Sequence, residues 1–188
     1  MLKLLVIILT LSSFFTKAQE IEQDQCARTG SLKTEDIVKN FPFNQAKEIK
    51  LVSFKGRGDE PLDEIPKVNG QVDIKQLFEI KVVSSTSKPK LLDMLMNINY
   101  IPLKPISTDK DSVKTFERSI RAVACYNPRN AILFENNRGE IFAYKEICFE
   151  CSRVKTQPEV LGVGDFCYEK YVLLENFFRD NGIHYGTN

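Results

Sequence analysis

The sequence has little net charge and no long hydrophobic run after its first residues. Its 26 lysine and arginine residues nearly balance its 25 aspartate and glutamate residues. Proteins that bind nucleic acids carry a basic excess or a basic stripe, so we expect no nucleic-acid partner. After residue 18 no apolar run approaches the roughly 20 residues of a membrane-spanning helix, so we expect no membrane span in the mature chain.

Signatures of catalysis are also scarce. The chain has one histidine, His184, which has no acid or nucleophile at motif spacing. It has no G-x-S-x-G or H-E-x-x-H motif, and GVGD at 162–165 resembles a phosphate-binding loop only faintly. Glu146 and Glu150 share one face of a predicted strand, as an acid and base pair requires, but exposed strand positions are commonly charged. We therefore expect a non-catalytic protein with no cofactor.

The N-terminus has the pattern of a secretory signal peptide. Lys3 precedes an apolar run over residues 4–11, and small residues stand at Thr16 and Ala18, where cleavage would occur. We expect export to the periplasm or the cell exterior, where cysteines form disulfides. The predicted organisation is a signal peptide (1–18), a flexible polar segment (19–33) and a single globular domain (34–188).

Apolar periodicity and breaker residues predict a mixture of helices and strands. The predicted strands are 47–55 and the second half of 72–83, and the predicted helices begin at Thr34, Pro89, Ser112 and near Asp165. The last helix carries Tyr171, Leu174, Phe177 and Phe178 and ends at Asn181 and Gly182. Because helices and strands do not alternate regularly, the expected fold class is α+β with a small sheet.

A β-hairpin at about 130–148 is the clearest local prediction. Two apolar runs flank Asn136 and Gly139, which supply the backbone angles of a tight reversal. If Glu135 faces Glu140, Cys125 lies on the same face of the hairpin as Cys148.

This geometry predicts how the cysteines pair. Cys125 would bond to Cys148. Cys151, on the opposite face and too far from Cys148 along an extended strand, would bond to Cys167. The C-terminal helix would then be tied to the hairpin by a disulfide. Cys26 can join this cluster, link two copies of the chain or remain unpaired.

Two other uses of the cysteines remain open. The C-x-x-C spacing of Cys148 and Cys151 is that of a dithiol exchanger, and Cys167 at a helix start can be a reactive thiol. Four thiolates, from Cys125, Cys148, Cys151 and Cys167, can also hold a zinc ion. Only one C-x-x-C is present, whereas zinc sites usually pair two such motifs.

The segment CYNPRNAILFENNRGEIFAYKEICFEC, with GDFCYEKYVLLENFF and the ending NGIHYG, resembles a group of exported bacterial proteins. Their shared pattern is C-Y-x-P-R, I-C-F-x-C and F-C-x-E-K-Y, and the likeness covers about residues 120–186. The resemblance brings no known activity. It implies that Cys125, Cys148, Cys151 and Cys167 form one structural unit.

Together these features predict an exported, disulfide-stabilised domain. We expect it to bind a protein or a small ligand of the cell envelope or exterior without catalysis. The alternative is a thiol-redox or zinc-binding protein that uses the four clustered cysteines.

Overall fold

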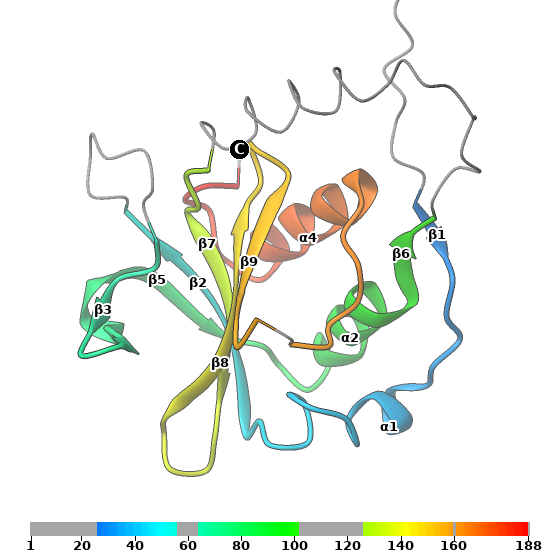
Figure 1. The fold of residues 1–188 in the computed structure, drawn as a ribbon, viewed down its shortest axis with the longest axis horizontal. Helices are drawn as coiled ribbons and strands as arrows, with labels where there is room; N and C mark the ends of the chain where they lie inside the picture. Colours follow the sequence, from blue (N-terminus) through cyan, green and yellow to red (C-terminus); the bar gives the residue numbers. More distant parts are fainter. Residues whose placement is uncertain (1–25, 56–63, 102–125, 160, 188) are drawn as a thin grey trace, which may run out of the picture.

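A five-stranded antiparallel sheet forms the centre of the fold (Figure 1). The computed structural model describes residues 26–55, 64–101, 126–159 and 161–187. Across the sheet, the strands are β5 (Leu77–Val82), β2 (Glu48–Phe54), β7 (Asn130–Glu135), β8 (Ile141–Cys148) and β9 (Arg153–Gln157). The sheet is antiparallel, and helices and strands do not alternate regularly along the chain, so the fold is α+β, as the sequence predicts.

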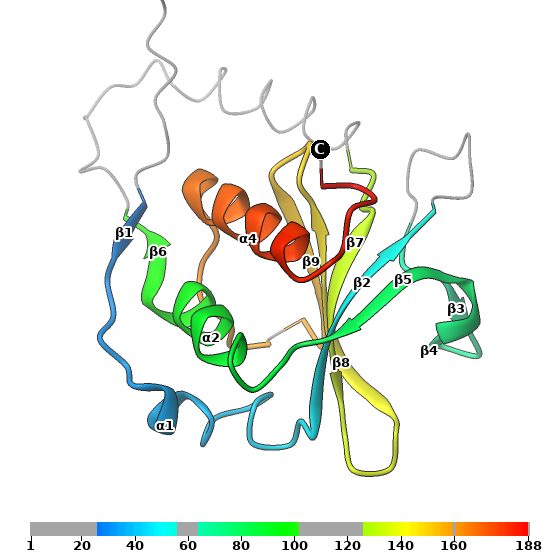
Figure 2. The ribbon, with the colours of Figure 1, turned by 180° about the vertical axis from the view of Figure 1, so that it is seen from behind.

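Two helices cover one face of this sheet. Helices α2 (Lys88–Asn97) and α4 (Tyr168–Asp180) lie side by side on it, as Figures 1 and 2 show from opposite sides. Their apolar faces bury the main core against the sheet, and the largest contributions come from Leu91, Leu95, Ile132, Phe134, Leu174, Phe177 and Phe178. No helix within the described ranges is long and apolar enough to cross a membrane.

The other face of the sheet carries a smaller apolar cluster. A two-stranded hairpin, β3 (Lys67–Val68) and β4 (Gln71–Val72), stands beside it, and a 3-10 turn (Ile74–Gln76) leads on to β5. The cluster consists of Val52, Phe54, Ile65, Ala131, Leu133 and Tyr144. Both faces of the central strands are therefore buried, which explains why β7 is apolar along most of its length.

Residues 26–28, inside the segment expected to be flexible, form a strand instead. This strand, β1 (Cys26–Arg28), pairs with β6 (Ile98–Tyr100), which directly follows α2. Arg28 also forms a bidentate ion pair with Asp93, at 2.6 and 2.7 Å. Two backbone N–H groups of the segment donate hydrogen bonds to the Asn97 carbonyl. No sequence signal indicates this pairing, because the partner strand is only three residues long.

Several local predictions are confirmed. The short helix α1 (Thr34–Ile37), the strand β2 and the second half of 72–83 as β5 lie where the sequence places them. Helix α2 matches the element predicted to begin at Pro89. The helix predicted from Ser112 lies outside the described residues.

The predicted hairpin is confirmed as β7 and β8, but its register differs by two residues. Asn130 faces Ile147, and Glu135 faces Ile141 rather than Glu140, with a bulge at that end of the ladder. Because side chains alternate between the faces with a period of two, a two-residue shift leaves each side chain on its predicted face.

The predicted disulfide pairing is wrong. Cys148 is bonded to Cys151 and Cys167 to Cys26, with Cα–Cα distances of 5.3 and 5.6 Å. Strand β8 ends at Cys148, and a turn over residues 149–152, in which Ser152 N donates to Phe149 O at 3.3 Å, brings Cys151 back toward it. The C-terminal helix is therefore tied to β1, not to the hairpin, and Cys125 lies outside the described residues.

The start of the C-terminal helix also differs from its prediction. Asp165 does not cap α4, because the helix begins at Tyr168 with Cys167 as its N-cap. Its end is as predicted: Asn181 follows the last turn, and Gly182 takes the left-handed backbone with a φ of 83°.

Removing the Cys26–Cys167 disulfide should weaken the fold strongly. The bond closes a loop with a sequence separation of 141 residues. In the chain-entropy description a loop of this size stabilises the folded state by about 3–5 kcal/mol. We expect a Cys26→Ala/Cys167→Ala variant to lose that much unfolding free energy in urea denaturation. An unchanged free energy would show that the two cysteines are not joined in the native protein.

Candidate functional site

A pocket of about 410 Å³ opens between the sheet and the segment that precedes α4. Lys145 of β8 with Val154 and Thr156 of β9 form one wall, residues 161–166 form the other, and Glu159 also lines the pocket. In Figure 2 this segment runs from the end of β9 toward the start of α4. The pocket therefore lies at the edge of the main core, on the helix-covered face of the sheet.

The unusual residue of this pocket is Lys145. Strand register places it between Ile132 of β7 and Thr156 of β9, on the face that α2 and α4 cover. Its side chain is only 5% exposed, although it lines the pocket. Within the described part of the chain its ammonium makes no hydrogen bond or ion pair. The ammonium makes a cation–π contact with the Phe166 ring, whose centre lies 4.2 Å from Nζ.

A second buried lysine, Lys170, lies close to the same aromatic ring. Its Nζ is 4.9 Å from the centre of the Phe166 ring, and the side chain is fully buried. Unlike Lys145, it has three oxygen acceptors: the carbonyls of Leu95 and Asp165, at 2.9 and 2.5 Å, and Asn99 Oδ1 at 3.2 Å. Lys170 is therefore a structural cation, whereas the ammonium of Lys145 remains available to a ligand.

Gly164 allows this close arrangement. A Cβ atom on Gly164 would lie 2.4 Å from the Leu95 carbonyl and 2.6 Å from Asn99 Oδ1, and its φ of 69° disfavours other residues. The GVGD sequence thus lets the chain pass directly over the end of α2. It serves as a wall of the pocket and not as the helix cap that the sequence predicts.

Burial lowers the pKa of Lys145 to about 8, although the Asp165 carboxylate favours its charged form. Burial and then the charge of Lys145 lower the pKa of Lys170, while its oxygen acceptors favour the protonated state. At neutral pH the pocket therefore presents a mostly protonated ammonium that lacks a counter-ion in direct contact.

The glycine-containing wall adds hydrogen-bond donors. The amide N–H groups of Gly162, Val163 and Gly164 donate to no acceptor among the described residues, whereas the amide of Asp165 donates to Asn99 Oδ1 at 3.1 Å. Backbone N–H groups beside a lysine ammonium are the donor set that binds carboxylate and phosphate oxygens.

Glu146, the predicted partner of Glu150, has a different role. It is fully buried on the opposite face of the sheet and accepts hydrogen bonds from Ile65 N and Tyr126 Oη, both at 3.0 Å. Burial raises the pKa of this carboxyl. Glu150 lies exposed in the turn after β8, so the two carboxylates do not form a pair at one site.

A larger pocket of about 520 Å³ lies between β4 and the β7–β8 turn. Its ionisable lining residue is Glu140, which already accepts hydrogen bonds from Asn136 and Arg138. This pocket offers no unpaired charge to a ligand. The pocket at Lys145 is therefore the better candidate for a binding site.

Among the described residues, Cys26, Cys148, Cys151, Cys167 and His184 do not gather into a metal site. No group of three or more His, Cys, Asp or Glu side chains within the described ranges is arranged to hold a metal ion. In the disulfide form Cys148, Cys151 and Cys167 offer no thiolate to zinc. The His184 backbone N–H donates to the Glu79 carboxylate at 3.2 Å, which anchors the C-terminal tail to β5.

Comparison with known proteins adds no assignment. No family model, no curated protein and no solved structure matches this chain.

Sequence reasoning missed both buried lysines, although a signal for each was present. Lys145 stands two residues from Ala143 and from Ile147, which share its face of β8 and belong to the core. Lys170 precedes Leu174 by one helical turn, so it lies on the buried face of α4. A lysine in phase with core residues is the pattern that marks such a site.

The stability of the protein should depend on pH through Lys145. The unfolded chain keeps this proton up to about pH 10.4, whereas the folded pKa is about 8. Between these values the unfolded state binds more protons, so unfolding free energy rises with pH. We expect Lys145→Met to be more stable than the wild type at pH 7 by about 1–3 kcal/mol and this gain to disappear near pH 10. Urea denaturation at several pH values measures it, and a pH-independent difference would contradict the burial of the charge.

Proposed function

We propose that this protein is an exported, disulfide-stabilised binding protein that holds a small anionic ligand in the pocket at Lys145. The single observation that carries the proposal is the placement of Lys145: the residue is only 5% exposed, it lines a pocket, and its ammonium has no hydrogen-bond or ion-pair partner among the described residues. A buried charge without a partner costs several kcal/mol of effective desolvation, so a ligand that supplies the opposite charge is favoured.

The donors around the pocket support an anion with oxygen atoms. The amides of Gly162 and Gly164 belong to the same pocket wall and have no acceptor among the described residues, so they can add to the donors that Lys145 supplies. The Nζ of Lys170 lies 4.9 Å from the centre of the Phe166 ring and adds positive potential near the pocket. Asp165 also lines the pocket, and its carboxylate, which favours the charged form of Lys145, opposes ligands of high negative charge.

Binding should depend on the charge of Lys145 more than on its shape. We expect titration calorimetry at low salt to show binding of inorganic phosphate or of citrate to the wild-type protein. Lys145→Met removes the charge at nearly constant volume and should weaken this binding at least tenfold, the loss of about 1.4 kcal/mol. Lys145→Arg keeps the charge and should retain part of the affinity.

Lys75→Met is the matched control, because Lys75 is exposed and far along the chain from the pocket. It should bind like the wild type. The proposal fails if the wild type binds neither anion, or if Lys145→Met binds them as tightly as the control does.

The exported location is the second part of the proposal. It is supported by the signal-peptide pattern of the first 18 residues and by two disulfides, which persist in oxidising compartments. Expressed with its leader in a bacterium that has a periplasm, the protein should be recovered there with Gln19 as its first residue. Mass spectrometry without reduction should find the peptides of Cys26 and Cys167 linked. Full-length chain with reduced cysteines in the cytoplasm would contradict export.

A further inference from the structure

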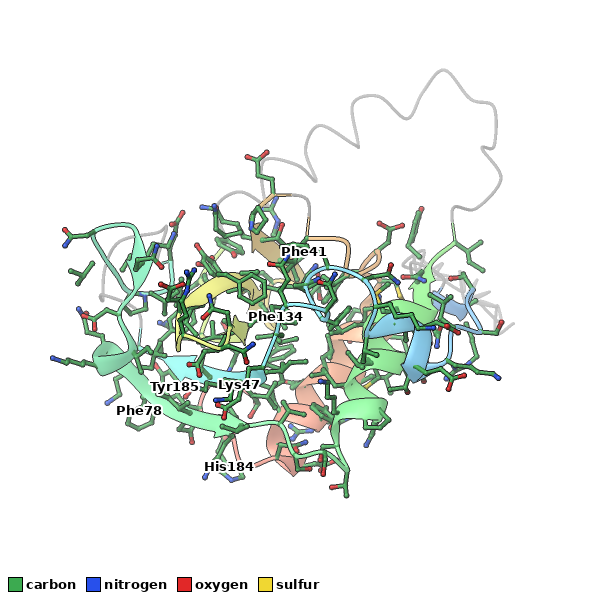
Figure 3. All side chains as sticks on the ribbon, turned by 90° about the horizontal axis from the view of Figure 1, so that it is seen from below. Phe41, Lys47, Phe78, Phe134, His184 and Tyr185 are labelled. Atoms are coloured by element: carbon green, nitrogen blue, oxygen red, sulfur yellow. A yellow bond between two sulfur atoms is a disulfide. The ribbon has the colours of Figure 1, made fainter. Side chains whose placement is uncertain are left out.

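Strand β5 is the outermost strand on one side of the sheet, and its free edge is apolar. Figure 3 shows β5 at the outside of the sheet, with Phe78 and Tyr185 beside it. Phe78, Ile80 and Val82 are 53%, 39% and 54% exposed. Natural edge strands usually carry charges or prolines that prevent pairing with another chain. Strand β5 does carry Glu79 and Lys81, but large apolar residues alternate with them.

The main chain of two of these residues, Ile80 and Val82, points away from the sheet. Val83 N donates to Ile49 O at 2.8 Å, which fixes which residues of β5 bond to β2. Along an antiparallel ladder, alternate residues bond to the neighbouring strand. Glu79 and Lys81 therefore bond to β2, while the N–H and C=O groups of Ile80 and Val82 face the open edge. Within the described ranges no strand pairs with this row.

We propose that β5 pairs in antiparallel orientation with β5 of a second copy of this chain, with Ile80 on the twofold axis. In this register each Ile80 faces its counterpart, and Phe78 faces Val82 of the second copy. The central Ile80–Ile80 pair is then a hydrogen-bonded pair, so the outward main-chain groups of Ile80 in both copies are satisfied. Glu79 then faces Lys81 of the second copy on both sides of the axis.

Charge complementarity selects this register. A shift of two residues in one direction places Glu79 opposite Glu79, and a shift in the other places Lys81 opposite Lys81. Like charges directly opposite one another destabilise strand pairing. A shift of one residue breaks the main-chain pattern, because inward and outward residues would then face each other.

The opposite edge of the sheet does not have this self-complementarity. Strand β9 carries Arg153 and Lys155 two residues apart, and pairing of β9 with itself around Lys155 would bring like charges together. The bulge between β5 and β2 falls at Phe78, near the start of β5, so Ile80 and Val82 remain in regular pairing.

The contact comprises few residues on each copy, so the dimer should be reversible and concentration-dependent. Sedimentation velocity of the mature protein at increasing concentration should show a monomer that converts to a dimer. Lys81→Glu places a second carboxylate opposite Glu79 of the other copy and should weaken dimerisation at least tenfold. Lys33→Glu makes the same change of charge at an exposed position near α1 and should dimerise like the wild type.

A cysteine cross-link tests the register itself. In hydrogen-bonded antiparallel pairs the Cα atoms are about 5.5 Å apart, within the range of a disulfide. Ile80→Cys should therefore form a linked dimer on oxidation. Val82→Cys should not, because the two copies of residue 82 would be about 13 Å apart.

Three outcomes would overturn the proposal. They are a wild type that stays monomeric at every concentration, a Lys81→Glu variant that dimerises like Lys33→Glu, and Val82→Cys dimers that link as readily as those of Ile80→Cys. A monomeric wild type would leave the edge of β5 to an extended segment of another protein.

Discussion

The arrangement of the molecule depends on the oxygen atoms that surround the ammonium of Lys170. Leu95 belongs to α2, Asn99 to β6 and Asp165 to the pocket wall, and all three accept hydrogen bonds from one nitrogen on α4. Lys170 is fully buried, and hydrogen bonds to such acceptors offset the cost of removing its charge from water. The end of α2, the wall of the pocket and the first turns of α4 are therefore held at fixed distances from one another.

Asn99 extends this network to the N-terminal segment. Its Oδ1 accepts from Lys170 and from the Asp165 amide, and its Nδ2 donates to Thr29 Oγ1 at 2.7 Å. The Cys26–Cys167 disulfide joins the same two regions covalently. The positions of residues 161–166 thus follow from a disulfide, a buried cation and the absence of a side chain at Gly164. This combination keeps the pocket wall in place without a regular secondary structure of its own.

Elements with strong local signals could be predicted, and elements that depend on distant partners could not. The β7–β8 hairpin and the end of α4 have turn residues whose backbone preferences are independent of the rest of the fold. The pairing of Cys148 with Cys151 depends on a turn over residues 149–152, a stretch without the glycine, proline, asparagine or aspartate that usually signals a turn. The pairing of β1 with β6 depends on contacts between residues far apart in sequence. The pocket was missed because Lys145 resembles a solvent-facing residue until the strands on both sides of β8 are known.

The two proposed binding surfaces lie at opposite edges of the sheet. The strand order runs from β5 to β9, and the pocket at Lys145 opens beside β9 while the apolar edge belongs to β5. Pairing through β5 would therefore join two sheets into one continuous sheet and leave both pockets at its outer ends. A ligand at Lys145 neutralises a buried charge without touching the dimer contact, so ligand binding and self-association should be energetically independent. Coupling between them would require movement across the whole sheet, and the densely packed core between β2, β7 and the helices opposes such movement.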